Sequence, residues 1–107
     1  MFEVSEKALE KMRQAQQGQE GPLSIRVFKT EGGWKGPHLV MAFDEEKEND
    51  EVFTMKGITF LIEKELYERS KPIYIDYTES ALGPGYTLKS ELMKGSIFEC
   101  DNIRNHC

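Results

Sequence analysis

The sequence predicts a single domain of the α+β class, mainly antiparallel, with two helices. At 107 residues the chain has close to the commonest size of one domain. Most of its apolar residues fall in short runs joined by tight turns, which is typical of antiparallel strands. Only two stretches show the spacing of an amphipathic or short buried helix. One small β-rich core with a few helices follows from these observations.

Composition excludes several classes of function. Hydrophobic residues make up 38% of the chain and charged residues 31%, which is typical of a water-soluble domain. The net charge is −5 and no basic stripe is present, so neither nucleic acid nor an anionic membrane surface is an expected partner. No apolar run approaches the ~20 residues of a membrane span. The two cysteines near the end form no disulfide framework, and the first residues do not resemble a signal peptide, so we expect a cytoplasmic protein.

The first elements are a short strand over residues 2–4 and a helix over about Ser5–Gln17. Ser5 is a favoured N-cap residue, and Glu6 suits the first helical turn. An apolar stripe follows at helical spacing, formed by Ala8, Leu9, Met12 and Ala15. Glycines beyond residue 17 end the helix. We therefore expect an amphipathic helix that lies on a sheet.

Residues 23–43 read as two strands around an unusual loop. The first strand, Leu23–Lys29, alternates apolar and polar residues, which indicates a half-buried strand. The second, His38–Phe43, is apolar on both faces, as expected of a central strand. The loop between them holds three glycines, and Gly32-Gly33 permits a tight reversal of the chain.

The run that follows, Asp44–Glu51, is strongly acidic. A calcium loop would need defined ligand spacing and a glycine turn, and neither is present. The sequence therefore favours a solvated loop.

The second half of the chain contains the remaining elements. We expect a hairpin with its turn at Lys56-Gly57, a short helix over Glu63–Ser70, and two strands over 73–77 and 86–90. Asp76 has two interpretations, a catalytic carboxylate or a structural hydrogen bond to a nearby turn. The structural role is favoured because no base or metal partner is evident in the sequence.

Several of these residues match a known family. Thr30, Gly32 and Gly36 resemble the hairpin-loop pattern of the HesB/IscA-like A-type iron–sulfur cluster carriers, with Gly33 at the position of their loop cysteine. Asp76-Tyr77 resembles the family's Asp followed by an aromatic residue, and the similarity covers about Phe2–Tyr86. The resemblance implies a compact, twisted β-sandwich with two helices over residues 1–95, followed by a cysteine-containing tail over residues 96–107.

The resemblance also implies a cargo and its ligands. Family members carry a Cys-Gly-Cys pair in the tail, and here Cys100 is the nearer match and Cys107 the looser one. Iron–sulfur clusters are held by cysteine thiolates, usually four, so a homodimer would supply enough thiols for one bridging cluster. We expect an iron–sulfur cluster or iron as the bound group, with Cys100 and Cys107 as ligands.

Two histidines are further candidate metal ligands. His106 neighbours Cys107, and His38 follows the loop near the place where the family's ligands converge. Imidazole binds iron, zinc and copper. The alternative for His38 is a surface or hydrogen-bonded residue at a strand start, since no ligand spacing supports it. Trp34 in the loop either packs on a partner or folds back over the sheet.

The ending at His106-Cys107 has a further interpretation. Some HesB-like relatives are described as selenoproteins with selenocysteine in this tail. A UGA codon read as a stop would truncate such a chain here. An open reading frame beyond codon 107 is the test of this hypothesis.

Three functions follow from these features. The first is a diverged iron–sulfur cluster or iron carrier that binds metal through tail thiols across a dimer and serves assembly or recipient proteins. The second is a cluster-free protein-binding module that retains the fold. The third, a thiol enzyme, is weakest, because the cysteines lack C-x-x-C spacing and an evident activating group. We therefore expect a protein that is not an enzyme.

Overall fold

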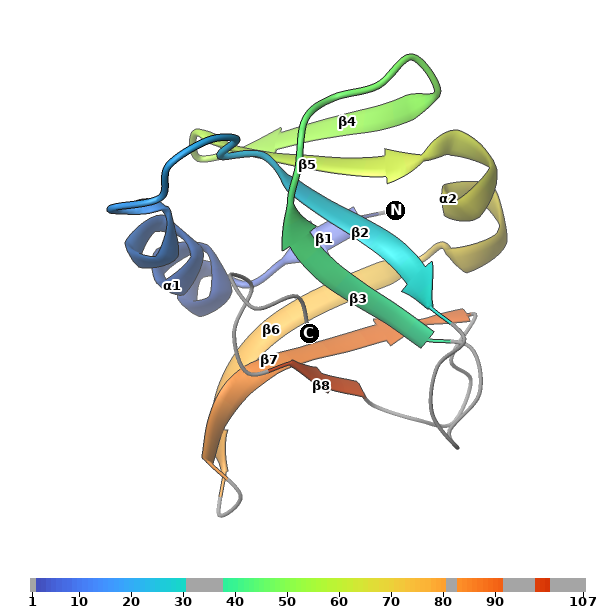
Figure 1. Ribbon diagram of the computed structural model, residues 1–107. Coiled ribbons are helices and arrows are strands. Elements are labelled where there is room, and N and C mark those ends of the chain that lie inside the picture. The colour runs from blue at the N-terminus through green and yellow to red at the C-terminus, as the bar shows by residue number, and fades with distance from the viewer. Residues whose placement is uncertain (1, 31–37, 81–82, 92–97, 101–107) are drawn as a thin grey trace.

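The computed structural model describes residues 2–30, 38–80, 83–91 and 98–100. They form two four-stranded sheets that pack face to face, with a helix at either side (Figure 1). The elements are, in chain order, β1 (Phe2–Val4), α1 (Glu6–Gln16), β2 (Ile25–Thr30), β3 (His38–Phe43), β4 (Asp50–Met55), β5 (Ile58–Glu63), α2 (Lys64–Ser70), β6 (Ile73–Ser80), β7 (Gly83–Ser90) and β8 (Phe98–Cys100). The α+β prediction with two helices is confirmed.

The strand order shows how the two sheets are built. Sheet A has the order β1-β6-β7-β8, and sheet B has the order β3-β2-β5-β4. Every hairpin pair is antiparallel, as predicted, but β1 pairs with β6 and β2 pairs with β5 in parallel. The sequence did not predict these two pairs, because their strands are far apart in the chain and no local turn signals them.

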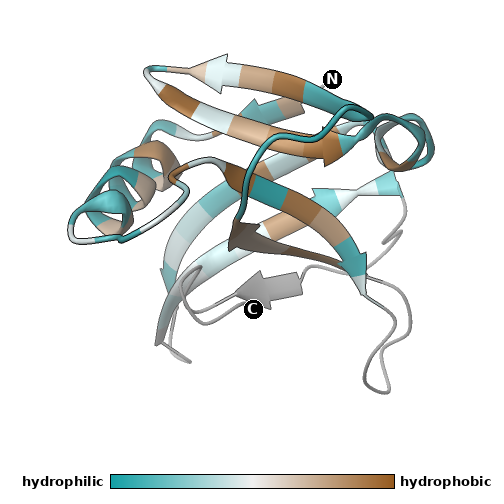
Figure 2. Ribbon diagram, turned by 45° about the horizontal axis from the view of Figure 1, so that its top comes forward, coloured by the Kyte–Doolittle hydropathy of each residue, from teal (hydrophilic) through white to brown (hydrophobic). Residues whose placement is uncertain are grey.

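The two sheets and α1 bury one apolar core. Figure 2 shows hydrophobic residues along the strands of sheet B and on α1. α1 adds Ala8, Leu9 and Met12 from its apolar stripe, as predicted. Phe2 joins the two sheets, because its ring stacks on Phe53 of sheet B with 4.8 Å between ring centroids. Aromatic pairs of this kind stabilise beyond the apolar area that they bury.

The start of α1 is tied to sheet A through one carboxylate. The backbone N–H of Ala8 donates to Ser5 Oγ at 3.1 Å, which makes Ser5 the N-cap as predicted. Ser5 Oγ in turn donates to Asp76 Oδ1 at 2.5 Å, and the backbone N–H of Tyr77 donates to the same oxygen at 2.8 Å. Asp76 therefore has the structural role that the sequence favoured, with the helix cap as its partner.

Two local expectations differ from the structure. β3 is an edge strand of sheet B, although its apolar character had indicated a central strand. Leu39, Val40 and Met41 are nevertheless buried, and β8 of sheet A lies beside the strand. Leu23 precedes β2 and is 48% exposed, so the alternation over residues 23–27 extended the predicted strand too far. The turn at Lys56-Gly57 is as predicted, with φ of 50° and 84°.

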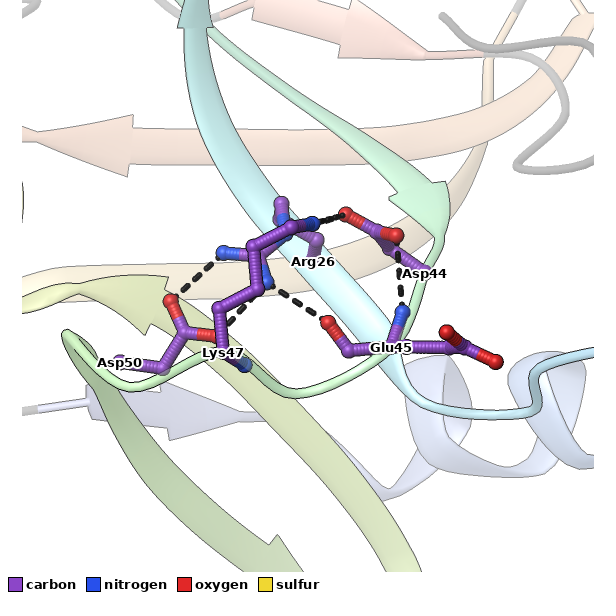
Figure 3. A network of polar contacts seen from close by, with 5 residues as sticks. All are labelled: Arg26, Asp44, Glu45, Lys47 and Asp50. Atoms are coloured by element: carbon purple, nitrogen blue, oxygen red, sulfur yellow. Dashed lines mark hydrogen bonds and ion pairs between the residues drawn. The ribbon is translucent and has the colours of Figure 1, made fainter.

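Arg26 holds the connection between β3 and β4 against the outer face of sheet B (Figure 3). Its Nε donates to Asp44 Oδ2 at 2.6 Å, and Nη1 and Nη2 donate to both oxygens of Asp50 at 2.7 and 2.6 Å. Nη2 also donates to the carbonyl oxygen of Glu45. The side chain of Arg26 is 13% exposed and that of Asp50 only 3%. We call these four residues the Arg26 clamp.

The clamp changes the interpretation of the acidic run. Glu45 to Asn49 are exposed, as expected of a solvated loop, but Asp44 and Asp50 at its ends serve as the counter-ions of Arg26. Within the described ranges no group of three or more His, Cys, Asp or Glu side chains is arranged to hold a metal ion.

Asp50→Asn should lower the free energy of unfolding by about 2–3 kcal/mol. The substitution leaves the largely desolvated guanidinium of Arg26 with Asp44 as its remaining carboxylate partner in the clamp. Urea denaturation of the variant against the unchanged chain measures the loss. Glu48→Gln is the matched control, since Glu48 is exposed in the same loop. Equal stability of Asp50→Asn and Glu48→Gln would contradict the role of the clamp.

The clamp also predicts a pH dependence of stability. Hydrogen bonds from Lys47 and the Glu45 N–H, together with Arg26, lower the pKa of Asp44 to about 2, and Arg26 lowers the pKa of Asp50. The unfolded chain then takes up protons before the folded chain does, so stability falls as pH is lowered from about 4 to about 2. Urea midpoints over this range should fall more steeply for the unchanged chain than for an Asp44→Asn/Asp50→Asn double variant. Parallel slopes would contradict the assignment.

Candidate functional site

β8 places Cys100 at the edge of sheet A. The strand pairs antiparallel with β7, in a register that sets Cys100 opposite Tyr86 and Phe98 opposite Leu88. Residues 98–100 thus extend sheet A by one edge strand. The backbone of Cys100 is therefore attached to a strand whose apolar residues belong to the core.

Tyr86, the residue across the ladder from Cys100, belongs to an aromatic pair. Tyr86 is 4% exposed and packs edge-on against Tyr77, with 5.0 Å between ring centroids. Burial, with a smaller effect of Tyr77, raises the pKa of Tyr86 to about 12, so its hydroxyl stays protonated at neutral pH. Lys11 of α1 lies over the Tyr77 ring at 5.3 Å. Tyr86 therefore supplies no anionic ligand at neutral pH.

His38 lies on a neighbouring strand, but at the other end. It is the first residue of β3 and pairs in the register with Thr30. β3 and β8 lie side by side and run in the same general direction (Figure 1). Since His38 begins β3 and Cys100 ends β8, the two residues are at opposite ends of adjacent strands. The structure therefore does not bring their backbones together within one chain.

The remaining candidate ligands are beyond the part of the chain that the structure describes. Cys107 and His106 lie outside the described residues, as do Gly33 and Trp34 of the hairpin loop. Cys107 is seven residues beyond Cys100 in the chain, and an extended segment of this length spans at most about 24 Å. A second thiol within this reach of Cys100 is therefore compatible with chain geometry.

The sequence did not predict the ion pairs of Arg26 or the position of Tyr86 opposite Cys100. For Arg26 a signal was present, a charged residue in a half-buried strand close to a run of carboxylates. For Tyr86 no local signal distinguishes a core tyrosine from one that supports a cysteine strand. Its position opposite Cys100 depends on the pairing of a three-residue strand.

Solved structures share the architecture of this chain. The crystal structure of IscA with the 2Fe–2S cluster superposes with a TM-score of 0.70 and 20% identity, over 85% of this chain and 83% of that one. Escherichia coli SufA gives a TM-score of 0.70 with 16% identity, over 81% of this chain and 77% of the other. These likenesses define a protein with the IscA/SufA fold, the α+β sandwich that the resemblance had implied.

Sequence relatives identify the family. No family model matches the chain. It is 32% identical over 91 residues to the putative iron-sulfur cluster insertion protein ErpA of Dechloromonas aromatica, covering 83% of this chain and 78% of the relative. It is 31% identical over 88 residues to the iron-sulfur cluster insertion protein ErpA of Marinobacter nauticus, covering 80% of each. The chain belongs to the HesB/IscA-like family of A-type iron–sulfur carriers.

Other matches are closer but shorter. The uncharacterized protein SufA of Bacillus subtilis is 42% identical over 65 residues, which is 60% of this chain and 54% of that protein. The chain thus matches about half the length of this relative. Among the described residues, neither helix has the length and apolar character needed to span a membrane.

Proposed function

We propose that this protein is a diverged iron–sulfur cluster or iron carrier that holds its cargo through the tail thiols of two chains. It acts without catalysis, in the cytoplasm, as a homodimer that exchanges cargo with assembly or recipient proteins. The observation that carries the proposal is the position of Cys100 on β8, paired with a core strand. Relatives named as iron-sulfur cluster insertion proteins support the same class of function.

The donor set favours two chains over one. The chain contains two cysteines, whereas a cluster usually needs four thiolates. His38 begins a strand at the end away from Cys100, which makes it a poor complement to Cys100 in the same chain. Cys107 and His106 follow Cys100 on the same segment and are the nearer candidates in sequence. Two such tails together supply four thiols.

A second function is favoured by one residue. Gly33 stands where the family has its loop cysteine, so the hairpin loop itself offers no thiolate. A chain that has lost its cluster would retain the fold and act as a protein-binding module. The two functions differ in whether the tail cysteines bind iron.

Anaerobic reconstitution with iron and sulfide tests the proposal. Cys100→Ser should remove most of the bound iron and visible absorbance, because Cys100 lies on the ordered strand nearest the core. Cys107→Ser should reduce both less, since oxygen or imidazole groups nearby can substitute in part. Gly33→Cys should increase both, because it adds a thiolate to the loop. Iron per chain, visible absorbance and dimer mass are the readouts.

Asn102→Ser is the control for changes to the tail that remove no thiol, and circular dichroism shows whether each variant folds. If Cys100→Ser loses no iron and Gly33→Cys gains none, the carrier function is wrong and the protein-binding module takes its place. Iron uptake that is equal in Cys100→Ser and Asn102→Ser leads to the same conclusion.

A further inference from the structure

β4 is the edge strand of sheet B on the side away from the cysteine strand. Among the described strands it pairs with β5 alone, whereas β3 at the other edge of the sheet lies beside β8 (Figure 1). Natural proteins commonly protect such edges with prolines, lysines or bulges. β4 contains no proline or lysine, and its register with β5 continues over its whole length without a bulge. The strand therefore has an unprotected edge.

The backbone groups that point out of this edge belong to Val52 and Thr54. The two-residue turn after β4 closes on the pair of Met55 and Ile58, so Met55 and every second residue before it exchange hydrogen bonds with β5. The residues between them direct their N–H and C=O groups away from β5. Within the described part of the chain, Val52 and Thr54 make no backbone hydrogen bond outside sheet B. Both residues can therefore pair with a further strand.

The side chains at this edge suit a neighbouring strand. Val52 is 41% exposed, and Thr54 is exposed as well. Both are β-branched, and such side chains pack well against residues of an adjacent strand. Phe53 between them holds β4 in place, because its ring stacks on Phe2 of sheet A. An added strand would thus cover an exposed apolar side chain without displacing the core.

The amino end of β4 carries an excess of negative charge. The charges of the Arg26 clamp are balanced, since Arg26 and Lys47 are the ion-pair partners of its two aspartates. The adjacent α2 and its caps contain as many carboxylates as cations, namely Glu63, Lys64, Glu65, Glu68, Arg69 and Lys71. The carboxylates that have no side-chain partner in the described residues are Glu45, Glu46, Glu48 and Glu51. A second copy of this chain would bring the same carboxylates and a net charge of −5, so the edge favours a basic partner.

We propose that the open edge of β4 binds an extended segment of a partner protein, which adds to sheet B as a further strand. The segment runs antiparallel to β4, because antiparallel pairing is the more stable arrangement. Its backbone pairs with Val52 and Thr54, and one of its apolar side chains covers Val52. Its carboxyl end carries basic residues, since in this orientation that end meets Glu48 and Glu51. The inference uses neither the cysteines nor iron, so it stands apart from the carrier function.

The probe is a short fluorescein-labelled peptide of alternating threonine and valine that ends in lysines. One control peptide has the same sequence with N-methylated threonines and valines, which cannot pair with a strand, and the other ends in glutamates. The target is the full chain without iron and with alkylated thiols, so the result is independent of the carrier function. Fluorescence anisotropy should show saturable binding of the lysine peptide that weakens at high salt, and binding of both controls that is weaker by about tenfold or more.

Variants of the chain test the two features of the edge separately. Val52→Lys should weaken binding about fivefold or more, because it removes the apolar contact and adds a cation. Tyr74→Lys is its matched control on sheet A, where Tyr74 is 36% exposed, and should change binding less than about twofold. Glu51→Gln should weaken binding about threefold or more at low salt, whereas Glu79→Gln, the same change on β6, should leave it within about twofold. Circular dichroism shows whether each variant folds.

Amide hydrogen exchange locates the bound segment. The amides of Val52 and Thr54 point out of the edge, so they should exchange more slowly when the lysine peptide is bound. Protection centred elsewhere, equal binding of the N-methylated peptide, or equal loss of affinity in Val52→Lys and Tyr74→Lys would overturn the proposal. A two-chain species of the alkylated, iron-free chain that Val52→Lys converts to single chains would overturn it in favour of a second copy at this edge.

Discussion

The ion pairs of Arg26 with Asp44 and Asp50 hold the connection between β3 and β4, called the crossing below, against the outer face of sheet B. The strand order of sheet B depends on this connection. After β3 the chain passes over the outer face of the sheet and returns through the hairpin of β4 and β5, which places β5 beside β2 in parallel. A guanidinium that is only 13% exposed is costly to leave unpaired, because it is partly desolvated. The two carboxylates at the ends of the loop therefore stabilise the crossing.

Closure of the two sheets on one core has a second consequence. It brings the edges β3 and β8 together, so the strand that carries Cys100 is supported both by β7 and by its contact with sheet B. The backbone of Cys100 thus belongs to a paired strand. The adjacent strands run in the same direction, however, so the residues that end β8 and begin β3 are separated. This geometry is the structural reason for proposing that two chains complete one cargo site.

Local features of the fold were predictable from sequence, and contacts over long distances were not. Ser5 and the apolar spacing of α1 predict that helix, and Lys56-Gly57 predicts its hairpin, because both signals act within a few residues. The parallel pairing of β2 with β5 and the edge position of β3 depend on how separate units pack, which no local pattern encodes. The partners of Arg26 are 18 and 24 residues away, so their identity became clear only in the folded chain.

The candidate site was predictable only in part, for the same reason. Family resemblance singled out Cys100 as a candidate ligand, but not its register opposite Tyr86, because a three-residue strand has almost no signal of its own. The roles of Cys100, Cys107, His106 and His38 as ligands remain predictions. Gly33 shows how a sequence can retain a family's fold while it lacks one of that family's ligands.

Native mass spectrometry of the reconstituted protein, before and after alkylation of its thiols, shows whether the thiols of two chains hold the cargo. We expect a two-chain species that carries iron and sulfide before alkylation, and chains without iron afterwards. Alkylated chains that retain as much iron as untreated ones would contradict a cargo site built from the thiols of two tails.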